Sequence, residues 1–303
     1  MNINALVVFV LCIALSGTLD LERLKFHRSW QYLPKESCGY GITTDKIIGG
    51  IEAGLGQFPW LVRLIYSDNK TDYYGCAGSI INRWHVLTAA HCNAGVLKRD
   101  IKSILVGENF MATEIDCEGD FCAPKPVIIP IEVVINHYVY PKRITATALG
   151  DIAVVRTKSP IIFNDFIRPI CLPTDTIIRN IKAEMSLGTE IQVAGWGLTD
   201  AVTVEIPSNM MHVTMPVVSL NDCRRRYTAH INYSQICIGE SFGKDSCVGD
   251  SGGPAMKAIT LDGPPKYYLM GIVSYGARLC GTSVAIYTNV TYYMDWILDQ
   301  ITK

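Results

Sequence analysis

The cysteines place the strongest single constraint on what this chain can fold into. The chain has 303 residues and 11 cysteines, and Cys12 lies in an apolar run over residues 5–15. That run is too short to span a bilayer, has the length of a signal-peptide core and is followed by the small residues Ser16 and Gly17. Removal of residues 1–16 would leave an even number of cysteines, which indicates five disulfides and an oxidising compartment. We therefore expect a secreted, extracellular protein.

Composition and charge exclude several other classes. Hydrophobic residues make up 49% of the chain and the formal net charge is -1. The apolar fraction is enough for a packed core, which excludes a largely disordered chain. The balanced charge gives no reason to expect nucleic acid or a membrane as a partner. Three N-glycosylation sequons, at Asn69, Asn232 and Asn289, agree with secretion.

The pattern of polar and apolar residues divides the chain into a leader and one long region. Residues 17–46 are polar with little periodicity, and we expect them to form an irregular leader. From residue 47 onward, short apolar runs alternate with Gly, Pro, Asn and Asp, which predicts many short strands in a sandwich or a pair of barrels. The clearest helix signal is an apolar stripe at the C-terminus, formed by Tyr293, Trp296, Ile297 and Ile301.

A serine flanked by glycines is the strongest local signal for chemistry. Residues 249–254 read GDSGGP, with Ser251 in the middle. A serine hydroxyl is a weak nucleophile until a base takes its proton. Glycines let the backbone turn tightly, and they leave backbone N–H groups free to face a developing oxyanion. The pattern predicts a nucleophilic serine, with a plain glycine-serine turn as the alternative.

Two further residues complete a catalytic set. His91 follows a strand-like run and is a candidate general base. Asp151 stands at the start of an apolar run and is a candidate for orienting the imidazole. Taken alone, such a histidine is more often structural and such an aspartate is an ordinary turn residue. The order His91, Asp151, Ser251 matches the chymotrypsin order and differs from the subtilisin and α/β-hydrolase orders.

Residues 47–303 resemble a trypsin-like serine protease domain of the chymotrypsin family. The resemblance implies an all-β fold of two packed six-stranded antiparallel barrels with a C-terminal helix. It also implies a serine-type endopeptidase whose active site lies between the barrels and needs no cofactor. The motifs that carry it occur in the family's order: IIGG at 47–50, TAAHC at 88–92, DIAVV at 151–155, AGWG at 194–197, GDSGGP at 249–254 and SYG at 274–276.

The resemblance assigns a role to each motif residue. Ser251 is expected to be the nucleophile, His91 the general base and acid, and Asp151 the residue that orients His91. The backbone N–H groups of Gly249 and Ser251 are expected to form the oxyanion hole. Asp245 is expected at the base of the primary specificity pocket, where a carboxylate selects Arg or Lys before the scissile bond. The remaining substrate-binding residues are expected to be Ser274, Tyr275, Gly276 and Ala285.

Ala285 departs from the family pattern. The family usually has glycine at this position of the pocket wall, two residues before Tyr287. The segment from Cys280 to Tyr287 is also about two residues shorter than the family pattern. Both differences bear on the size of the pocket, so the preference between Arg and Lys stays open.

The bond between Lys46 and Ile47 resembles a zymogen cleavage site. Residues 17–46 would then be an activation peptide that becomes a light chain. Cleavage would free the Ile47 amino group, which the family pairs with the aspartate before the serine, here Asp250. Loss of one partner of such a buried pair costs about 3–5 kcal/mol. Because lysine precedes the cut, the expected activator is itself trypsin-like.

The resemblance also implies how the cysteines pair. The insert that contains Cys117 and Cys122 is typical of arthropod clip-domain proteases, and Cys38 and Cys171 remain to tether the leader. A clip module carries six further cysteines that this sequence does not show, so the chain resembles a clip-type catalytic domain with the clip lost. The expected disulfides are Cys38–Cys171, Cys76–Cys92, Cys117–Cys122, Cys223–Cys237 and Cys247–Cys280.

The loop that contains Glu108 and the arginines at 224–226 give weaker signals. Glu108 occupies a position where trypsin-like enzymes can hold Ca²⁺, but the second acid of that loop is not evident. The six histidines show no metal-ligand spacing, so we expect no metal. Residues 224–226 are three arginines, which we expect on a solvated helix face, with an anion-binding exosite as the alternative.

The resemblance therefore implies a secreted zymogen that cleaves proteins after Arg or Lys, in an extracellular cascade or a venom. The implied partners are protein substrates, an upstream trypsin-like activating protease and protein inhibitors such as serpins. The alternative is a non-catalytic protease homologue that acts as a binding module or cascade cofactor. Such homologues usually lose the serine, whereas His91, Asp151 and Ser251 are all present here.

Overall fold

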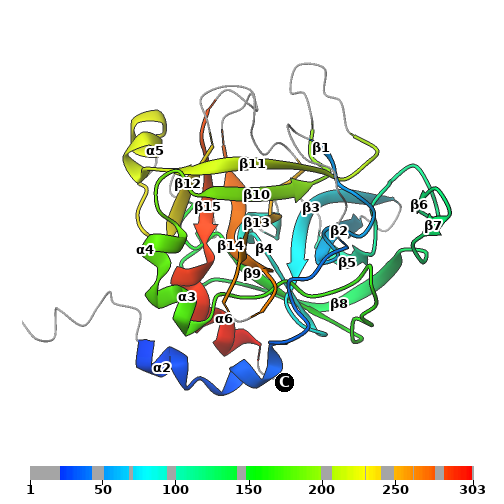
Figure 1. Ribbon diagram of the computed structural model, residues 1–303, viewed down its shortest axis with the longest axis horizontal. Coiled ribbons are helices and arrows are strands. Elements are labelled where there is room, and N and C mark those ends of the chain that lie inside the picture. Colours follow the sequence, from blue (N-terminus) through cyan, green and yellow to red (C-terminus); the bar gives the residue numbers. More distant parts are fainter. Residues whose placement is uncertain are drawn as a thin grey trace, which may run out of the picture.

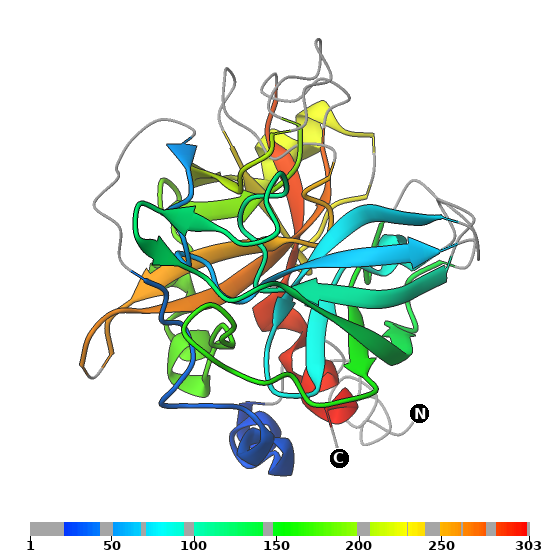
Figure 2. The same cartoon turned by 90° about the vertical axis from the view of Figure 1, so that its right-hand side faces the viewer.

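Two closed barrels contain most of the strands in the computed structural model (Figure 1). Figure 2 shows the cyan and green strands of the first barrel beside the orange and yellow strands of the second. The structure describes residues 21–42, 51–67, 71–93, 100–141, 148–198, 207–228, 230–239, 249–261, 263–276 and 283–301.

The first barrel is built from the first half of the chain. Its strands pair antiparallel in the order β2–β3–β4–β9–β8–β5, and β5 returns to β2 to close the ring. Nearly every residue of β2, β4 and β9 is buried, because both faces of these strands are covered. The strands are β2 (Leu61–Ser67), β3 (Asp72–Ile80), β4 (His85–Thr88), β5 (Asp100–Val106), β8 (Val127–Asn136) and β9 (Ala153–Thr157).

The second barrel is built from the second half of the chain. Its order is β11–β10–β13–β14–β15–β12, and pairing of β11 with β12 closes it, while β1 (Ile51–Glu52) adds to β11 from outside. The predicted fold of two six-stranded antiparallel barrels is therefore confirmed. The strands are β10 (Glu190–Gly195), β11 (Met211–Val218), β12 (Gln235–Ile238), β13 (Pro254–Ile259), β14 (Lys266–Tyr275) and β15 (Ala285–Asn289).

The predicted C-terminal helix is also confirmed. A short 3₁₀ segment, η3 (Val290–Tyr293), leads into α6 (Met294–Gln300). Tyr293, Ile297 and Ile301 are buried in the main apolar core, and Trp296 packs against that core. The three- to four-residue spacing of the apolar residues thus predicted which face of α6 packs against the core.

Two further short helices, α3 (Asp175–Arg179) and α4 (Ile181–Glu184), were not predicted from the sequence. A third, α5 (Leu220–Arg226), contains the arginines that were expected on a helix face. A capping box starts α5, because the Ser219 hydroxyl accepts from the Asp222 N–H and the Asp222 carboxylate accepts from the Ser219 N–H. The arginines at 224–226 are exposed on this helix, as expected for a solvated face.

The leader is more ordered than the sequence led us to expect. We expected residues 17–46 to be irregular, but α2 (Leu21–Lys25) and the 3₁₀ segment η1 (Arg28–Tyr32) form two helical turns there. The sequence of this segment has no long apolar stripe, so tertiary contacts rather than local periodicity decide its structure. Leu24 is fully buried in the main core, and the Trp30 indole donates to the Leu24 carbonyl at 2.6 Å.

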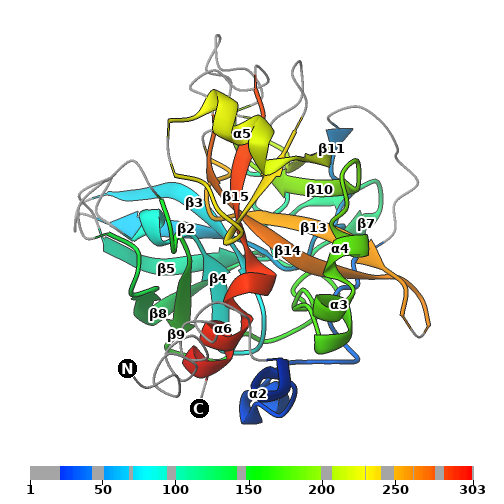
Figure 3. The ribbon, with the colours of Figure 1, turned by 90° about the vertical axis from the view of Figure 1, so that its left-hand side faces the viewer.

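Charged contacts join the leader to the C-terminal helix. The Arg23 guanidinium lies 3.4 Å from the Asp295 carboxylate and 3.3 Å from the Asp299 carboxylate. His27 Nε2 lies 3.1 Å from Asp299 Oδ1. Figure 3 shows α2 next to α6 and α3 on this side of the molecule. Because Arg23 and Asp299 are largely solvated, these pairs orient the leader more than they stabilise it.

Four of the five expected disulfides are formed by described residues. The Cys38–Cys171 bond joins the leader to the segment between the barrels, and Cys117–Cys122 closes the hairpin of β6 (Cys117–Glu118) and β7 (Phe121–Cys122). The other two bonds are Cys76–Cys92 and Cys223–Cys237. Cys247 and Cys280 lie outside the described residues.

No helix among the described residues is long and apolar enough to cross a bilayer.

The leader generates a prediction about stability. Leu24→Ala should lower the free energy of unfolding by about 2–5 kcal/mol, because it removes a fully buried side chain and leaves a cavity. Phe26→Ala is the matched control, since Phe26 is 75% exposed and its truncation should change stability by about 0.5 kcal/mol or less. Denaturant unfolding with the disulfides intact measures both. Equal midpoints for the two variants would show that the leader does not pack in the core in solution.

Candidate active site

Strand pairing in the first barrel brings His91 and Asp151 together. Strands β4 and β9 are antiparallel, and Thr88 faces Ala153. The residues just after β4 therefore lie beside the residues just before β9. His91 sits in the 3₁₀ turn η2 (Ala90–Cys92), which the disulfide from Cys92 to Cys76 fastens to β3.

The Asp151 carboxylate is buried and fully engaged. Asp151 is 1% exposed. Its Oδ1 accepts from the His91 backbone N–H at 2.8 Å, and its Oδ2 lies 2.8 Å from His91 Nδ1. The Ser274 hydroxyl donates to Oδ2 at 2.5 Å. This set of donors holds the imidazole with Nδ1 toward the carboxylate, which leaves Nε2 for a reacting group.

The environment makes His91 a stronger base than an ordinary histidine. Burial by itself lowers the pKa of a histidine, since it disfavours the charged imidazolium. The charge of the Asp151 carboxylate and its hydrogen bond act in the opposite direction and prevail, so the pKa of His91 is raised above its usual value. The arrangement therefore favours an imidazole that accepts a proton and is stabilised once charged.

The Ser251 turn is clamped between the two barrels. The Ser251 carbonyl accepts from the Ala77 N–H on β3 at 2.8 Å, and the Gly252 N–H donates to the Val273 carbonyl on β14 at 2.9 Å. Cys92 Sγ lies 3.8 Å from the Ser251 carbonyl oxygen, so the serine backbone adjoins the histidine loop. Ser251 is half-buried at this junction.

Glycine is required at Gly252. Its φ is +78°, and a Cβ there would lie 2.2 Å from Thr88 Oγ1 and 2.5 Å from the Ala77 carbonyl oxygen. Any side chain would force the serine turn away from β3 and β4. Glycine at position 252 thus lets the Ser251 turn approach the strand that leads into the histidine loop.

The residue before the serine faces the segment that ends β10. Asp250 Oδ1 accepts from the Gly197 N–H at 2.8 Å. Side chains at Gly195 and Gly197 would collide with this carboxylate, at 2.1 Å and 2.5 Å respectively. Gly249, with φ +107°, also approaches Gly197, since a Cβ there would lie 2.9 Å from the Gly197 Cα.

Several predicted site residues lie outside the described residues. These include both sides of the cleavage site, Lys46 and Ile47, and the residue expected at the base of the pocket, Asp245. The pairing of Ile47 with Asp250 and the basic specificity therefore stay predictions. The oxyanion hole of Gly249 and Ser251 also stays a prediction, which the resemblance carries.

The predicted substrate-binding strands are neighbours. Ser274 and Tyr275 end β14, Gly276 follows them, and Ala285 begins β15, with Tyr275 opposite Ile286. Ala285 is 1% exposed and belongs to the apolar cluster inside the second barrel. Its place in the pocket wall stays a prediction.

The loop that contains Glu108 has a second acid that sequence reasoning missed. Asp116 is fully buried, and its carboxylate accepts from the N–H groups of Asn109 and Phe110 and from the Thr113 hydroxyl. Its role in the loop is therefore structural. Burial, with the nearby charge of Asp116, raises the pKa of Glu108. A remaining apparent cluster, His91 with Cys76 and Cys92, offers no thiolates because the two cysteines form a disulfide.

Two of the three sequon asparagines are described, and both support local turns. Asn289 Oδ1 accepts from the N–H and hydroxyl of Thr291 at 3.1 and 2.6 Å, and Asn289 Nδ2 donates to the Tyr233 carbonyl. Asn232 Oδ1 accepts from the N–H and hydroxyl of Ser234. Glycosylation at these sites stays a prediction, as it does at Asn69, outside the described residues.

Comparison with known proteins agrees with this geometry. The Trypsin family model matches residues 47–297. The chain is 34% identical over 280 residues to the Spaetzle-processing enzyme of Drosophila melanogaster, covering 87% of this chain and 68% of that protein. It is 37% identical over 274 residues to Phenoloxidase-activating factor 3 of Holotrichia diomphalia, covering 86% and 74%. The chain therefore belongs to the trypsin family of serine endopeptidases.

The clip-domain proteases of insects are the relatives it resembles within that family. A crystal structure of the Drosophila Grass clip serine protease of the Toll pathway superposes with a TM-score of 0.75 at 31% identity, covering 93% of this chain and 77% of that chain. The resemblance stated from the motifs is thus confirmed.

The raised pKa of His91 predicts the pH profile. His91 must be neutral to take a proton, so activity is lost as pH falls through its pKa. Because Asp151 raises that pKa above 6.5, the acid limb of kcat/KM should have its midpoint above pH 6.5. Asp151→Asn should move the midpoint to lower pH and reduce kcat about 10⁴-fold. The measurement is kcat/KM of the activated enzyme against pH, and a wild-type midpoint at or below 6.5 would contradict the assignment.

Proposed function

We propose that this chain is a secreted serine endopeptidase, made as a zymogen, which cleaves proteins after Arg or Lys in an extracellular proteolytic cascade. The observation that carries the catalytic part is the buried Asp151 carboxylate 2.8 Å from His91 Nδ1, beside the clamped Ser251 turn. Non-catalytic homologues usually lose the serine, whereas His91, Asp151 and Ser251 are all present in this chain.

The chemistry follows the roles of the three residues. Ser251 Oγ attacks the scissile carbonyl while His91 Nε2 takes the hydroxyl proton, and the carbonyl electrons move onto an oxyanion. The N–H groups of Gly249 and Ser251 would stabilise that oxyanion. His91 then gives its proton to the leaving amine, which leaves an acyl-enzyme. Water, deprotonated by His91, hydrolyses the acyl-enzyme and restores Ser251.

The names of the relatives support a role in a cascade. Spaetzle-processing enzyme and phenoloxidase-activating factors are named for acting on other proteins. By this analogy, the partners of the present chain are protein substrates, an upstream trypsin-like protease that cuts after Lys46, and protein inhibitors such as serpins. The disulfides agree with an extracellular location.

A non-catalytic homologue is the competing function. Labelling with a fluorophosphonate after cleavage at Lys46 separates the two, because only an activated serine reacts. Labelling of Ser251 supports the enzyme, and absence of labelling in folded, cleaved protein supports the binding module.

Ser251→Ala tests the nucleophile. The triad acts as a unit, so kcat should fall on the order of 10⁶-fold while the fold and substrate binding survive. Ser186→Ala is a control at an exposed serine and should leave kcat unchanged. Hydrolysis of an Arg-containing peptide measures both. Retention of more than a few per cent of the activity by Ser251→Ala would overturn the assignment.

Asp245 and Ala285 test the specificity. Asp245→Ser should abolish the preference for basic residues, whereas Asp100→Ser, at a surface acid, should not change it. Ala285→Gly should raise kcat/KM on Arg substrates, because one methyl group in a pocket is worth about 1–3 kcal/mol. A peptide-library profile of each activated variant is the measurement. No change in either Asp245→Ser or Ala285→Gly would mean that the pocket has been assigned to the wrong residues.

The Cys38–Cys171 bond predicts how the activated protein behaves on electrophoresis. Cleavage after Lys46 should leave the leader attached, because the bond joins Cys38, which precedes the cut, to Cys171, which follows it. The activated protein should run as one band without reductant and as two fragments with it. Cys38→Ser with Cys171→Ser is the control and should release the leader in denaturant without reductant. Release from the wild-type protein under the same conditions would refute the tether.

A further inference from the structure

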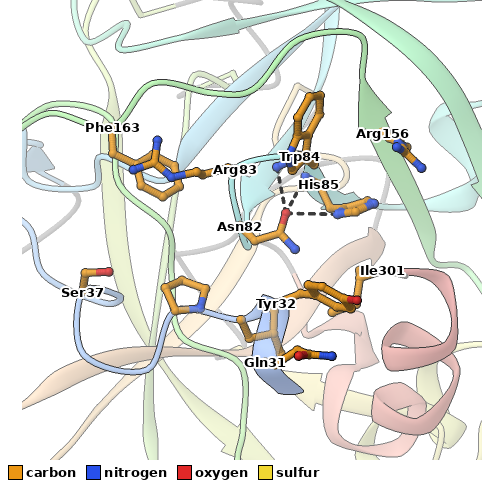
Figure 4. Close-up of a pocket in the computed structure, with 12 residues that line it drawn as sticks. Gln31, Tyr32, Ser37, Asn82, Arg83, Trp84, His85, Arg156, Phe163 and Ile301 are labelled. Atoms are coloured by element: carbon orange, nitrogen blue, oxygen red, sulfur yellow. Dashed lines mark hydrogen bonds between the residues drawn. The ribbon is translucent and has the colours of Figure 1, made fainter. Parts of the chain in front are cut away.

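A cavity of about 680 Å³ lies between the leader and the first barrel, away from the predicted catalytic residues. One wall is the leader segment around Tyr32, Leu33 and Pro34, and the opposite wall is the turn from Asn82 to His85 between β3 and β4 (Figure 4). Its volume is in the range of small-molecule sites. No part of the proposed catalytic mechanism uses it.

The walls of the cavity are largely apolar and aromatic. Tyr32 and Leu33 lie on the leader side, Trp84 and Phe163 on the barrel side, and Ile301 follows the C-terminal helix. Trp84 is 39% exposed, so part of a large aromatic surface remains available for contact. Aromatic walls of this kind suit a flat apolar group.

One buried amide points into the cavity with its nitrogen unused. Asn82 is 5% exposed. Its Oδ1 accepts from the Trp84 and His85 N–H groups at 2.8 Å each and lies 3.0 Å from His85 Nδ1. These bonds fix the orientation of the amide, and Figure 4 shows Nδ2 on the opposite side, toward Tyr32. Nδ2 makes no hydrogen bond within the described part of the chain, so it is free to donate to a ligand.

The charge of the lining is positive. Arg83 and Arg156 line the cavity, and none of the twelve lining residues is Asp or Glu. Arg156 pairs with Glu132, at 3.0 Å between Nε and Oε2. The Arg83 guanidinium lies over the Phe163 ring, 4.9 Å from its centroid, and makes no ion pair with any residue that the structure describes. Burial and the charge of Arg156 lower the pKa of His85 to about 4, so His85 is neutral near pH 7.

We propose that this cavity binds a small amphipathic carboxylate. The apolar body packs between the leader wall and the aromatic side chains Trp84 and Phe163. The carboxylate accepts from the Arg83 guanidinium and from Asn82 Nδ2. Because the leader supplies one wall, an occupied cavity also holds the leader more firmly on the first barrel, both before and after any cleavage at residue 46.

Calorimetric titration of the full chain with 1-naphthoate tests the site. Saturable 1:1 binding is expected, and the neutral isostere 1-naphthamide should bind at least about tenfold more weakly, since it lacks the charge-assisted hydrogen bonds. Arg83→Gln should weaken 1-naphthoate binding at least about tenfold, while Arg83→Lys should retain most of it. Arg225→Gln, an exposed arginine on α5, is the matched control and should bind as the wild type does.

The melting temperature is a second measurement, which distinguishes loss of binding from misfolding of a variant. 1-Naphthoate should raise the melting temperature of the wild type and of Arg225→Gln, but not of Arg83→Gln. Absence of saturable binding by the wild type, equal affinity for the acid and the amide, or equal binding by Arg83→Gln and Arg225→Gln would each overturn the proposal. The titration is repeated with Ser251→Ala, whose unchanged binding separates this site from the proposed catalysis.

Discussion

The structure depends on one buried negative charge. The carboxylate of Asp151 is almost completely removed from water, so every oxygen must find a donor within the protein. The donors come from both barrels, because His91 follows β4 of the first and Ser274 belongs to β14 of the second. The backbone carbonyl of Asp151 also accepts a hydrogen bond from the Thr288 hydroxyl on β15. Loss of a partner of such a charge costs about 3–5 kcal/mol, so the barrels and the histidine are held in one arrangement.

The serine turn is positioned by the same junction. The Ser251 carbonyl accepts a hydrogen bond from β3, and the Gly252 N–H donates one to β14, so neither barrel alone fixes the position of Ser251. Close packing of Gly252 against Thr88 ties the turn to the strand that leads into His91. Backbone contacts thus place the Ser251 turn beside the histidine loop, where His91 Nδ1 lies 2.8 Å from the Asp151 carboxylate.

The leader is attached to the barrels by contacts that lie apart from the proposed catalytic residues. Its firm contacts are the Cys38–Cys171 bond and the buried Leu24 side chain, whereas the ion pairs of Arg23 are exposed and contribute little to stability. A covalent bond that closes a long loop restricts the unfolded chain, and a buried leucine stabilises the folded one. The cavity beside Asn82 lies between this attached leader and the first barrel.

The sequence by itself determined the reaction class, the two-barrel architecture and the C-terminal helix. The reaction class and the two-barrel architecture follow from the resemblance of the motifs around Ser251, His91 and Asp151 to the trypsin-like family. Local apolar periodicity predicted the C-terminal helix but left a sandwich or a pair of barrels open. Only the tertiary structure decided the helical turns of the leader, the structural role of Asp116 and the cavity beside Asn82. The leader turns and the cavity depend on residues far apart in the sequence, as when Leu24 packs in the core. The role of Asp116 depends on how its loop folds back, so that the N–H groups of Asn109 and Phe110 reach the carboxylate. Local sequence patterns do not predict such contacts. The contacts depend on which surfaces of the closed barrels the rest of the chain covers.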